Sequence, residues 1–141
     1  MWKTLKLDPP VFQNYFFNTP DYLNWQNMNL NYIKSMAIWS LIGYYIGLGD
    51  RHCDNILIHQ DSGKIFHIDY DCIFEKGKKL PIPERLSFRL TKNVEAALGS
   101  FKAHGLFRYY MIELSKFFSK NCENIIGALD SFVHDPLLEN G

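Results

Sequence analysis

The sequence has no excess of charge of either sign and few cysteines. Fifteen Lys and Arg residues balance fifteen Asp and Glu residues among the 141, so we expect no direct nucleic-acid binding by a basic surface. The three cysteines, Cys53, Cys72 and Cys122, are widely spaced and form no Cys-x-x-Cys pair. An odd number of isolated cysteines is typical of free thiols in a reducing compartment and argues against a secreted disulfide framework.

Long hydrophobic runs are also missing. The longest apolar stretch, residues 36–48, is interrupted by Ser40 and is too short to cross a bilayer. Lys3, Lys6 and Asp8 break up the N-terminal residues, so no signal peptide is visible. There is no internal repeat, low-complexity tract or linker. We therefore expect one intracellular domain with a single core and no membrane contact.

Apolar periodicity predicts a mostly helical α+β domain. The strongest helical pattern covers residues 31–48, is apolar over most of its circumference, and is expected to be buried and to end at Gly47 and Gly49. Other helices are expected at 11–17, 92–98 (capped by Thr91), 105–119 and 122–134. Between them, strands at 56–59 and 64–68 flank a turn and form a hairpin, followed by a long loop over 70–88. The lysines of 76–79 in that loop are expected to be a solvated face.

Polar side chains cluster at one end of the predicted hairpin. Asn55 opens the first strand and Asp69 closes the second, so the two should lie side by side. An amide and a carboxylate suit Mg²⁺, a hard cation that fills its remaining positions with water and phosphate. Asp50 precedes Asn55 by five residues, the separation between the base and the metal-binding Asn of a protein-kinase catalytic loop. This spacing predicts phosphoryl transfer.

Each of these residues also has a simpler interpretation. Asp50 could be a turn or capping residue after the helix, and His52 an ordinary loop histidine. Arg51 is expected to be structural, holding the loop by pairing with a carboxylate. A zinc site is a further alternative, although its ligands have none of the usual spacings: His52, Cys53, His67 and Cys72.

The order Asp-Arg-His at 50–52, where ordinary protein kinases have His-Arg-Asp, carries a family resemblance. With Gly49 before it and His67-Ile68-Asp69 after the hairpin, it resembles the phosphatidylinositol 3-kinase-related protein kinases, and among them the ATR-type checkpoint kinases. The resemblance extends over almost the whole chain. It implies the C-terminal lobe of a PI3/PI4-kinase-like catalytic domain over residues 1–141, with a catalytic loop at 48–55 and an activation loop at 69–91.

The resemblance also implies roles for individual residues. Asp50 would orient and deprotonate the substrate hydroxyl, and His52 would stabilise the transferring group. Asn55 and Asp69 would hold ATP through Mg²⁺ or Mn²⁺. A segment similar to the family's substrate-positioning segment follows: Phe88, Arg89, Leu90 and Thr91.

The implied function is that of a nuclear Ser/Thr protein kinase in DNA-damage and replication-stress signalling. Such kinases favour Ser-Gln or Thr-Gln sites and respond to DNA through a partner, here one like the ATR-interacting protein. The kinase of nonsense-mediated mRNA decay shares much of the same loop, including a Tyr after the metal Asp, and is an alternative.

The chain contains no glycine-rich loop, no lysine-bearing third strand, and neither the helical repeats nor the C-terminal tail of the family. Those parts cover ATP or support the kinase, so we expect the polypeptide alone to be inactive or nearly so. A non-catalytic binding module is therefore a second class of function. The presence of Asp50, His52, Asn55 and Asp69 together favours an active parent kinase.

Overall fold

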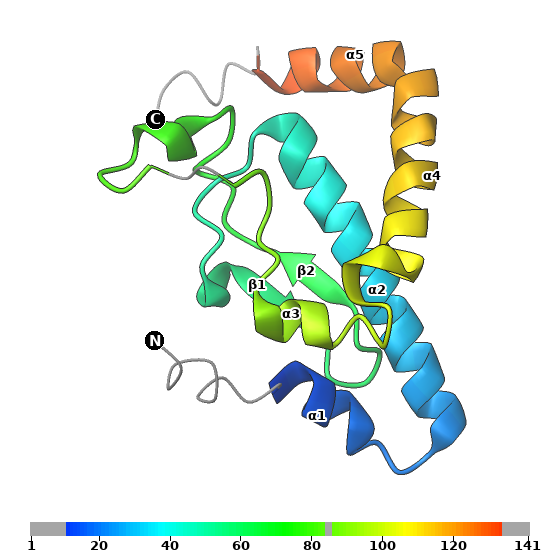
Figure 1. Cartoon of the computed structure of the whole chain (residues 1–141). Coiled ribbons are helices and arrows are strands. Elements are labelled where there is room, and N and C mark those ends of the chain that lie inside the picture. The colour runs from blue at the N-terminus through cyan, green and yellow to red at the C-terminus, as the bar shows by residue number, and fades with distance from the viewer. Residues whose placement is uncertain (1–10, 84–85, 134–141) are drawn as a thin grey trace.

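A long helix, α2 (Tyr22–Ile46), organises the fold (Figure 1). The computed structural model describes residues 11–83 and 86–133. The remaining elements are, in chain order, α1 (Val11–Phe17), β1 (Ile56–Ile58), β2 (Ile65–His67), α3 (Lys92–Ala96), α4 (Leu106–Lys120) and α5 (Cys122–Val133). Of these, α1, α4 and the strand β2 pack against α2, and α5 packs on α4. Short 3₁₀ turns lie at Cys53–Asn55, Lys76–Lys79 and Lys102–His104. The predicted end of the last helix, His134, lies outside the described residues.

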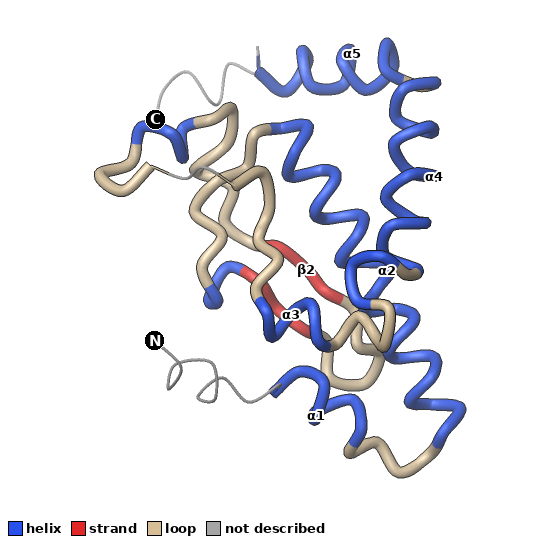
Figure 2. Tube along the Cα trace, in the orientation of Figure 1, coloured by secondary structure: helices blue, strands red, loops and turns tan. Residues whose placement is uncertain are grey.

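Figure 2 shows one small sheet among helices, as predicted for an α+β domain. Its two strands are antiparallel, with Ile56 opposite His67, Leu57 opposite Phe66 and Ile58 opposite Ile65. Both strands are one or two residues shorter than predicted, although backbone hydrogen bonds from His59 to Lys64 and from Ile68 to Asn55 continue the pairing just beyond the strand ends. Within the described residues no helix combines the length and hydrophobicity needed to cross a bilayer.

The predicted start of α2 at residue 31 is wrong. The helix begins at Tyr22, because Asp21 caps it: the Asp21 carboxylate accepts hydrogen bonds from the backbone N–H groups of Leu23 and Asn24, at 3.3 and 3.1 Å. The asparagines between residues 22 and 31 made the first turns of this helix hard to predict, since Asn has low helix propensity and interrupts the apolar period.

The prediction that this helix is buried holds for one face only. One face, including Tyr32, Met36 and Ala37, is buried, whereas Tyr44 and Tyr45 near its end are exposed. The elements with the most extensive contacts to α2, namely α4, β2 and α1, leave part of its circumference open.

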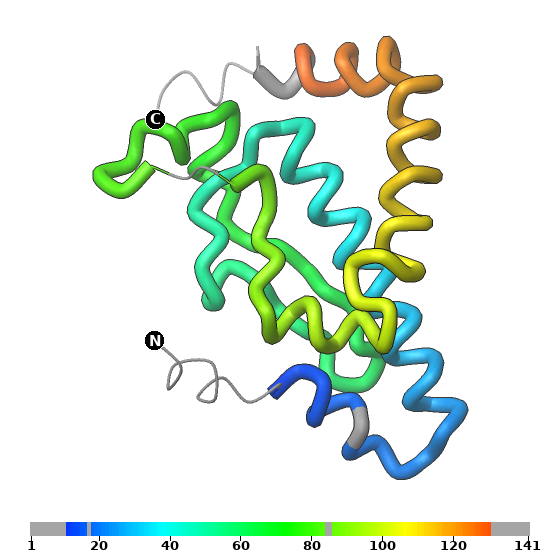
Figure 3. Tube along the Cα trace, in the orientation of Figure 1, coloured from blue at the N-terminus to red at the C-terminus, as the bar shows by residue number. Residues whose placement is uncertain are grey.

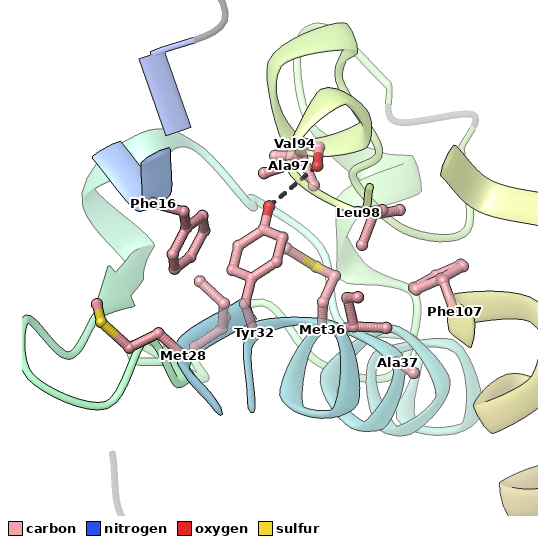
Figure 4. Packing of buried hydrophobic residues seen from close by; sticks show 11 residues of the cluster. Phe16, Met28, Tyr32, Met36, Ala37, Val94, Ala97, Leu98 and Phe107 are labelled. Carbon is pink, nitrogen blue, oxygen red and sulfur yellow. Dashed lines mark hydrogen bonds between the residues drawn. The ribbon is translucent and has the colours of Figure 1, made fainter. Parts of the chain in front are cut away.

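The core lies between α2 and the elements that pack on it (Figure 4). Tyr32 is fully buried, and its hydroxyl donates to the Val94 carbonyl at 3.1 Å. The Phe16 ring lies 5.0 Å from the Tyr32 ring at 62° and joins α1 to this core. Thr91 caps α3 as predicted, its hydroxyl accepting from the Val94 N–H. These contacts join α1 and α3 to the same part of α2.

The loop after β2 returns past the C-terminal end of α2 (Figure 3). The N–H of Gly49 donates to the Cys72 carbonyl at 2.7 Å, and the N–H of Phe74 donates to the Ile46 carbonyl at 2.8 Å. Gly47 ends α2 in the left-handed region, with φ 59°. A Cβ at Gly47 would lie 2.7 Å from the backbone nitrogen of Glu75, so this close approach requires glycine.

We therefore expect Gly47→Ala to lower the free energy of unfolding by more than the matched Gly99→Ala substitution. Both glycines have positive φ, at 59° and 91°, but a Cβ at Gly99 meets no atom within 4 Å. Gly99→Ala should cost about 1–2 kcal/mol from backbone strain alone, and Gly47→Ala should add the clash with Glu75. Urea unfolding of both variants measures the difference, and equal losses would contradict the close packing of the two loops.

Candidate active site

The candidate site lies at the end of the hairpin where β1 begins and β2 ends. The N–H of Ile68 donates to the Asn55 carbonyl at 3.1 Å, which places Asn55 and Asp69 at the same end of the two strands, as predicted. Asp50 and Asp69 both have left-handed backbones, with φ 56° and 61°. Non-glycine residues rarely adopt this conformation outside functional sites unless surrounding contacts hold it.

Asn55 is buried and joins the two halves of the polar loop. Its side-chain nitrogen donates to the carbonyl of Asp50 at 2.9 Å. The side-chain oxygen is therefore the atom with which Asn55 could ligate a cation. One carboxylate oxygen of Asp69 accepts the Asp71 N–H at 3.2 Å, which leaves its second oxygen for the same purpose. The donor set of one amide and one carboxylate oxygen fits Mg²⁺.

Arg51 is buried and connects the loop before β1 to the end of β2. Its guanidinium donates to the carbonyls of Gly49 at 2.8 Å and Ile68 at 2.7 Å, and also to that of Asp69. The predicted carboxylate partner of Arg51 is therefore wrong. Backbone carbonyls that are removed from water need hydrogen-bond donors, and the forked guanidinium of Arg51 supplies them to all three.

His52 lies beside Asp50 with a defined proton position. Its Nδ1 accepts a hydrogen bond from the backbone N–H of Asp54 at 3.3 Å, so the neutral ring carries its proton on Nε2. That nitrogen lies 4.0 Å from the Asp50 carboxylate. The Asp54 carboxylate is 97% exposed and lies 3.8 Å from Nδ1. The arrangement places one carboxylate and one N–H donor together on the surface of the loop.

His67 lies behind the site, not in it. Its ring stacks on Trp39, with centroids 5.2 Å apart and planes at 13°, and both ring nitrogens are buried without a hydrogen-bond partner among the described residues. Burial, assisted by the nearby Arg51 charge, lowers the pKa of His67 to about 4, so the ring is neutral near pH 7. The described residues contain no group of three or more His, Cys, Asp or Glu side chains arranged to bind a metal, which removes the support for the zinc alternative.

The residues predicted to position substrate lie in different environments. Phe88 and Leu90 are half-buried against the core, and Thr91 caps α3. Arg89 is exposed and donates to the Cys53 sulfur at 3.8 Å, which brings this segment to the loop that carries Asp50. The lysines at 76, 78 and 79 are exposed, as expected for a solvated face.

The hairpin also has an exposed apolar face that sequence reasoning missed. Leu57 and Phe66 are directly opposite each other, and Ile68 lies two residues further on the same face. Leu57 is 47% exposed and Ile68 is 42% exposed, next to the end that carries Asn55 and Asp69. The strand sequences, Ile-Leu-Ile and Ile-Phe-His, contain no apolar–polar alternation that would have indicated which face stays exposed.

Comparisons with known proteins agree with this architecture. A family model described as "Phosphatidylinositol 3- and 4-kinase" matches residues 3–141. Serine/threonine-protein kinase MEC1 of Kluyveromyces lactis is 37% identical over 96% of the chain, and protein kinase rad3 of Schizosaccharomyces pombe is 38% identical over 97%. Serine/threonine-protein kinase SMG1 of Danio rerio is 43% identical over 82% of the chain.

The chain spans only a small part of these relatives: 6% of the MEC1 and rad3 sequences and 3% of the SMG1 sequence. A solved structure described as the "FAT and kinase domain of CtTel1" superposes with a TM-score of 0.90 at 34% identity. The superposition covers 96% of the present chain and 10% of the solved chain. This match confirms the predicted fold, a mostly helical C-terminal lobe with a small hairpin.

Proposed function

From the premise that the chain belongs to the phosphatidylinositol 3- and 4-kinase family, we propose that it transfers the γ-phosphoryl group of ATP to Ser or Thr hydroxyls as the C-terminal lobe of a protein kinase. Its relatives are serine/threonine protein kinases. The observation that carries the proposal is the convergence of Asp50, His52, Asn55 and Asp69 at one end of the hairpin, where Arg51 ties both loops together.

The metal site is proposed from the oxygen atoms left available by the internal hydrogen bonds. The side-chain oxygen of Asn55 and the free carboxylate oxygen of Asp69 would hold Mg²⁺ or Mn²⁺. The bound ion would neutralise phosphate charge as it develops during transfer. The buried Asn55 amide and the Arg51 hydrogen bonds would keep both ligands in place before ATP arrives.

Asp50 and His52 would act on the transferring group. The Asp50 carboxylate would orient the attacking hydroxyl and accept its proton as the new O–P bond forms and the bond to the departing ADP oxygen breaks. The Nε2–H of His52, held toward Asp50 by the Nδ1 contact with Asp54, would donate to a phosphoryl oxygen. Phe88 to Thr91 would line the path of the substrate, with Arg89 at the edge of the loop.

The exposed face of the hairpin would hold the adenine base. Leu57 and Ile68 offer an apolar surface directly beside the proposed metal ligands, and a planar base buries such a surface favourably. The opposite wall of the nucleotide site would come from an N-terminal lobe that the 141 residues do not contain. We therefore propose that this lobe by itself has little or no activity.

We further propose that the parent kinase is of the ATR type and acts in the nucleus in DNA-damage and replication-stress signalling. Its substrates would carry Ser-Gln or Thr-Gln sites, and an ATR-interacting-protein-like partner would activate it through parts outside this lobe. The MEC1 and rad3 kinases support this assignment because they match almost the whole chain. The balanced charge agrees with the absence of a direct nucleic-acid role for this segment.

A second candidate rests on the higher identity to the SMG1 kinases. Smg1 of Dictyostelium discoideum is 47% identical over 77% of the chain, above the identity to MEC1 or rad3 but over a shorter span. This keeps the kinase of nonsense-mediated mRNA decay as an alternative. Silencing the gene separates the two: loss of Ser-Gln phosphorylation after replication stress supports the first, and accumulation of transcripts with early stop codons supports the second.

The test of the proposed chemistry is a transfer assay with the full-length gene product, labelled ATP and a Ser-Gln peptide. We expect Leu57→Asp to raise the KM for ATP by about three- to tenfold, because the base would bury only the 47% of Leu57 that is exposed, which gives about half of the 1.5–3 kcal/mol of full leucine burial. Leu106→Asp is the matched control, since Leu106 is equally exposed but lies on α4. Equal KM values for the two variants would overturn the proposed adenine site. Absence of both transfer and ATP binding in the wild-type protein would favour a non-catalytic binding module.

A further inference from the structure

Three aromatic side chains that have no part in the proposed chemistry lie against the turn at Asp69. Trp39 comes from α2, His67 ends β2, and Tyr70 follows Asp69 directly. Trp39 stacks on His67 with centroids 5.2 Å apart, and its ring lies 6.3 Å from that of Tyr70 at 37°. The Trp39 indole N–H also donates to the Ile65 carbonyl at 2.9 Å, which fixes the ring to β2. We refer to Trp39, His67 and Tyr70 as the aromatic clamp.

The clamp closes around the backbone of Asp69. The Tyr70 hydroxyl donates to the carbonyl of His67 at 2.8 Å. This hydrogen bond joins the residue after Asp69 to the residue two positions before Asp69. Asp69 itself has φ 61°, a left-handed conformation that is uncommon for non-glycine residues and that Asp adopts with the help of local hydrogen bonds, here from the Asp71 N–H to its carboxylate. The hydrogen bond from Tyr70 spans that strained residue.

Asp69 is thus held by two sets of contacts. In the first, Arg51 donates to the carbonyls of Ile68 and Asp69. In the second, Tyr70 is hydrogen-bonded to the His67 carbonyl and its ring lies against that of Trp39, which belongs to α2. A change in φ at Asp69 would rotate its carboxylate and break these bonds together.

We propose that Trp39, His67 and Tyr70 are positioning residues that hold Asp69 in its left-handed conformation and so direct its carboxylate toward the metal that carries ATP. The inference rests on the proposed function, because it assigns a purpose to the geometry of that same metal ligand. It adds to the site a support that comes from α2, 30 residues before Asp69 in the chain.

The test uses Tyr70→Phe, which keeps the ring and removes the hydroxyl. In the full-length kinase, we expect the Mg²⁺ concentration for half-maximal transfer to rise about fivefold, the factor that one hydrogen bond contributes. The kcat at saturating Mg²⁺ and the melting temperature should stay near wild type. Tyr22→Phe is the matched control, since Tyr22 is an exposed tyrosine at the start of α2 and should leave the Mg²⁺ requirement unchanged.

Two further measurements do not depend on activity. Mn²⁺ binding in the presence of a non-hydrolysable ATP analogue, followed by electron paramagnetic resonance, should weaken about fivefold in Tyr70→Phe. Without metal or nucleotide, hydrogen exchange of the Asp71 amide, which donates to the Asp69 carboxylate, should accelerate.

The outcomes separate this inference from the proposed function. Normal transfer with an unchanged Mg²⁺ requirement in Tyr70→Phe overturns the inference and leaves the kinase function standing. Metal–nucleotide binding that weakens in Tyr70→Phe, in a protein that transfers no phosphate, supports the inference and overturns the function. A fall in melting temperature and kcat without a change in Mg²⁺ requirement shows a purely structural role and overturns the inference.

Discussion

Replacing Asp69 by alanine should lower phosphoryl transfer by the full-length kinase by at least about a thousandfold and leave the protein folded. A catalytic metal contributes several kcal/mol to the transition state, and each 1.36 kcal/mol corresponds to a factor of ten. The fold should survive because the Asp69 side chain is exposed. Removal of the side chain breaks one hydrogen bond, from the Asp71 N–H, and leaves the backbone bonds of Arg51 to Ile68 and Asp69 in place.

Two companion variants make this result specific. Asp69→Asn keeps the shape and tolerates the left-handed backbone at φ 61°, so it separates loss of charge from the strain that alanine adds. Asp71→Asn removes an exposed carboxylate two residues away and should retain near wild-type transfer. Initial rates at saturating ATP and thermal melting by circular dichroism are the measurements. Normal turnover in Asp69→Ala would exclude Asp69 as the metal ligand.

Asp50→Asn should lower kcat by about 10²–10⁴, the range typical of a lost general base, with little change in the KM for ATP. The KM should be preserved because ATP would be held by the hairpin face and the metal ligands and not by Asp50. Asparagine is suited to the left-handed backbone at residue 50, where φ is 56°. The backbone carbonyl of Asp50, which accepts the hydrogen bond from Asn55, is unchanged in this variant.

The matched control for Asp50 is Asp61→Asn, in the exposed turn of the hairpin far along the strands from the site. Steady-state rates over a range of ATP concentrations give kcat and the KM for ATP separately. If Asp50→Asn raised the KM for ATP and left kcat intact, Asp50 would be a nucleotide-binding residue. If it changed neither, the kinase-like spacing from Asp50 to Asn55 would be coincidental.

The hydrogen bonds of Arg51 explain why Asp69→Ala and Asp50→Asn are expected to lower the rate of transfer more than the stability of the fold. Its three hydrogen bonds go to backbone carbonyls, so the loops keep their conformation when the carboxylates at their tips are changed. The buried amide of Asn55 adds a fourth connection within the first loop. The backbone that carries Asp50 and Asp69 is thus held by bonds that these substitutions leave in place, which suits groups that must be ready for a substrate.

Local patterns in the sequence were sufficient to predict most of the elements. Apolar periodicity and the caps at Thr91 and Gly47 located α1, α3 and the end of α2, because capping and periodicity depend on neighbouring residues. The hairpin followed from two apolar runs around a turn, and its ends brought Asn55 and Asp69 together. The motif around Asp50 pointed to a kinase family, which the comparisons confirmed.

Only the tertiary structure decided how the site is held and what lies beside it. The partners of Arg51 depend on left-handed turns at residues 50 and 69, which no local pattern indicated. The contact of Trp39 with His67 joins residues 28 positions apart, and the apolar face that includes Leu57 depends on which side of the hairpin α2 covers. The sequence determines side-chain types and their spacing directly. Hydrogen-bond partners and exposed faces depend on contacts between distant segments, so they exist only once those segments have packed.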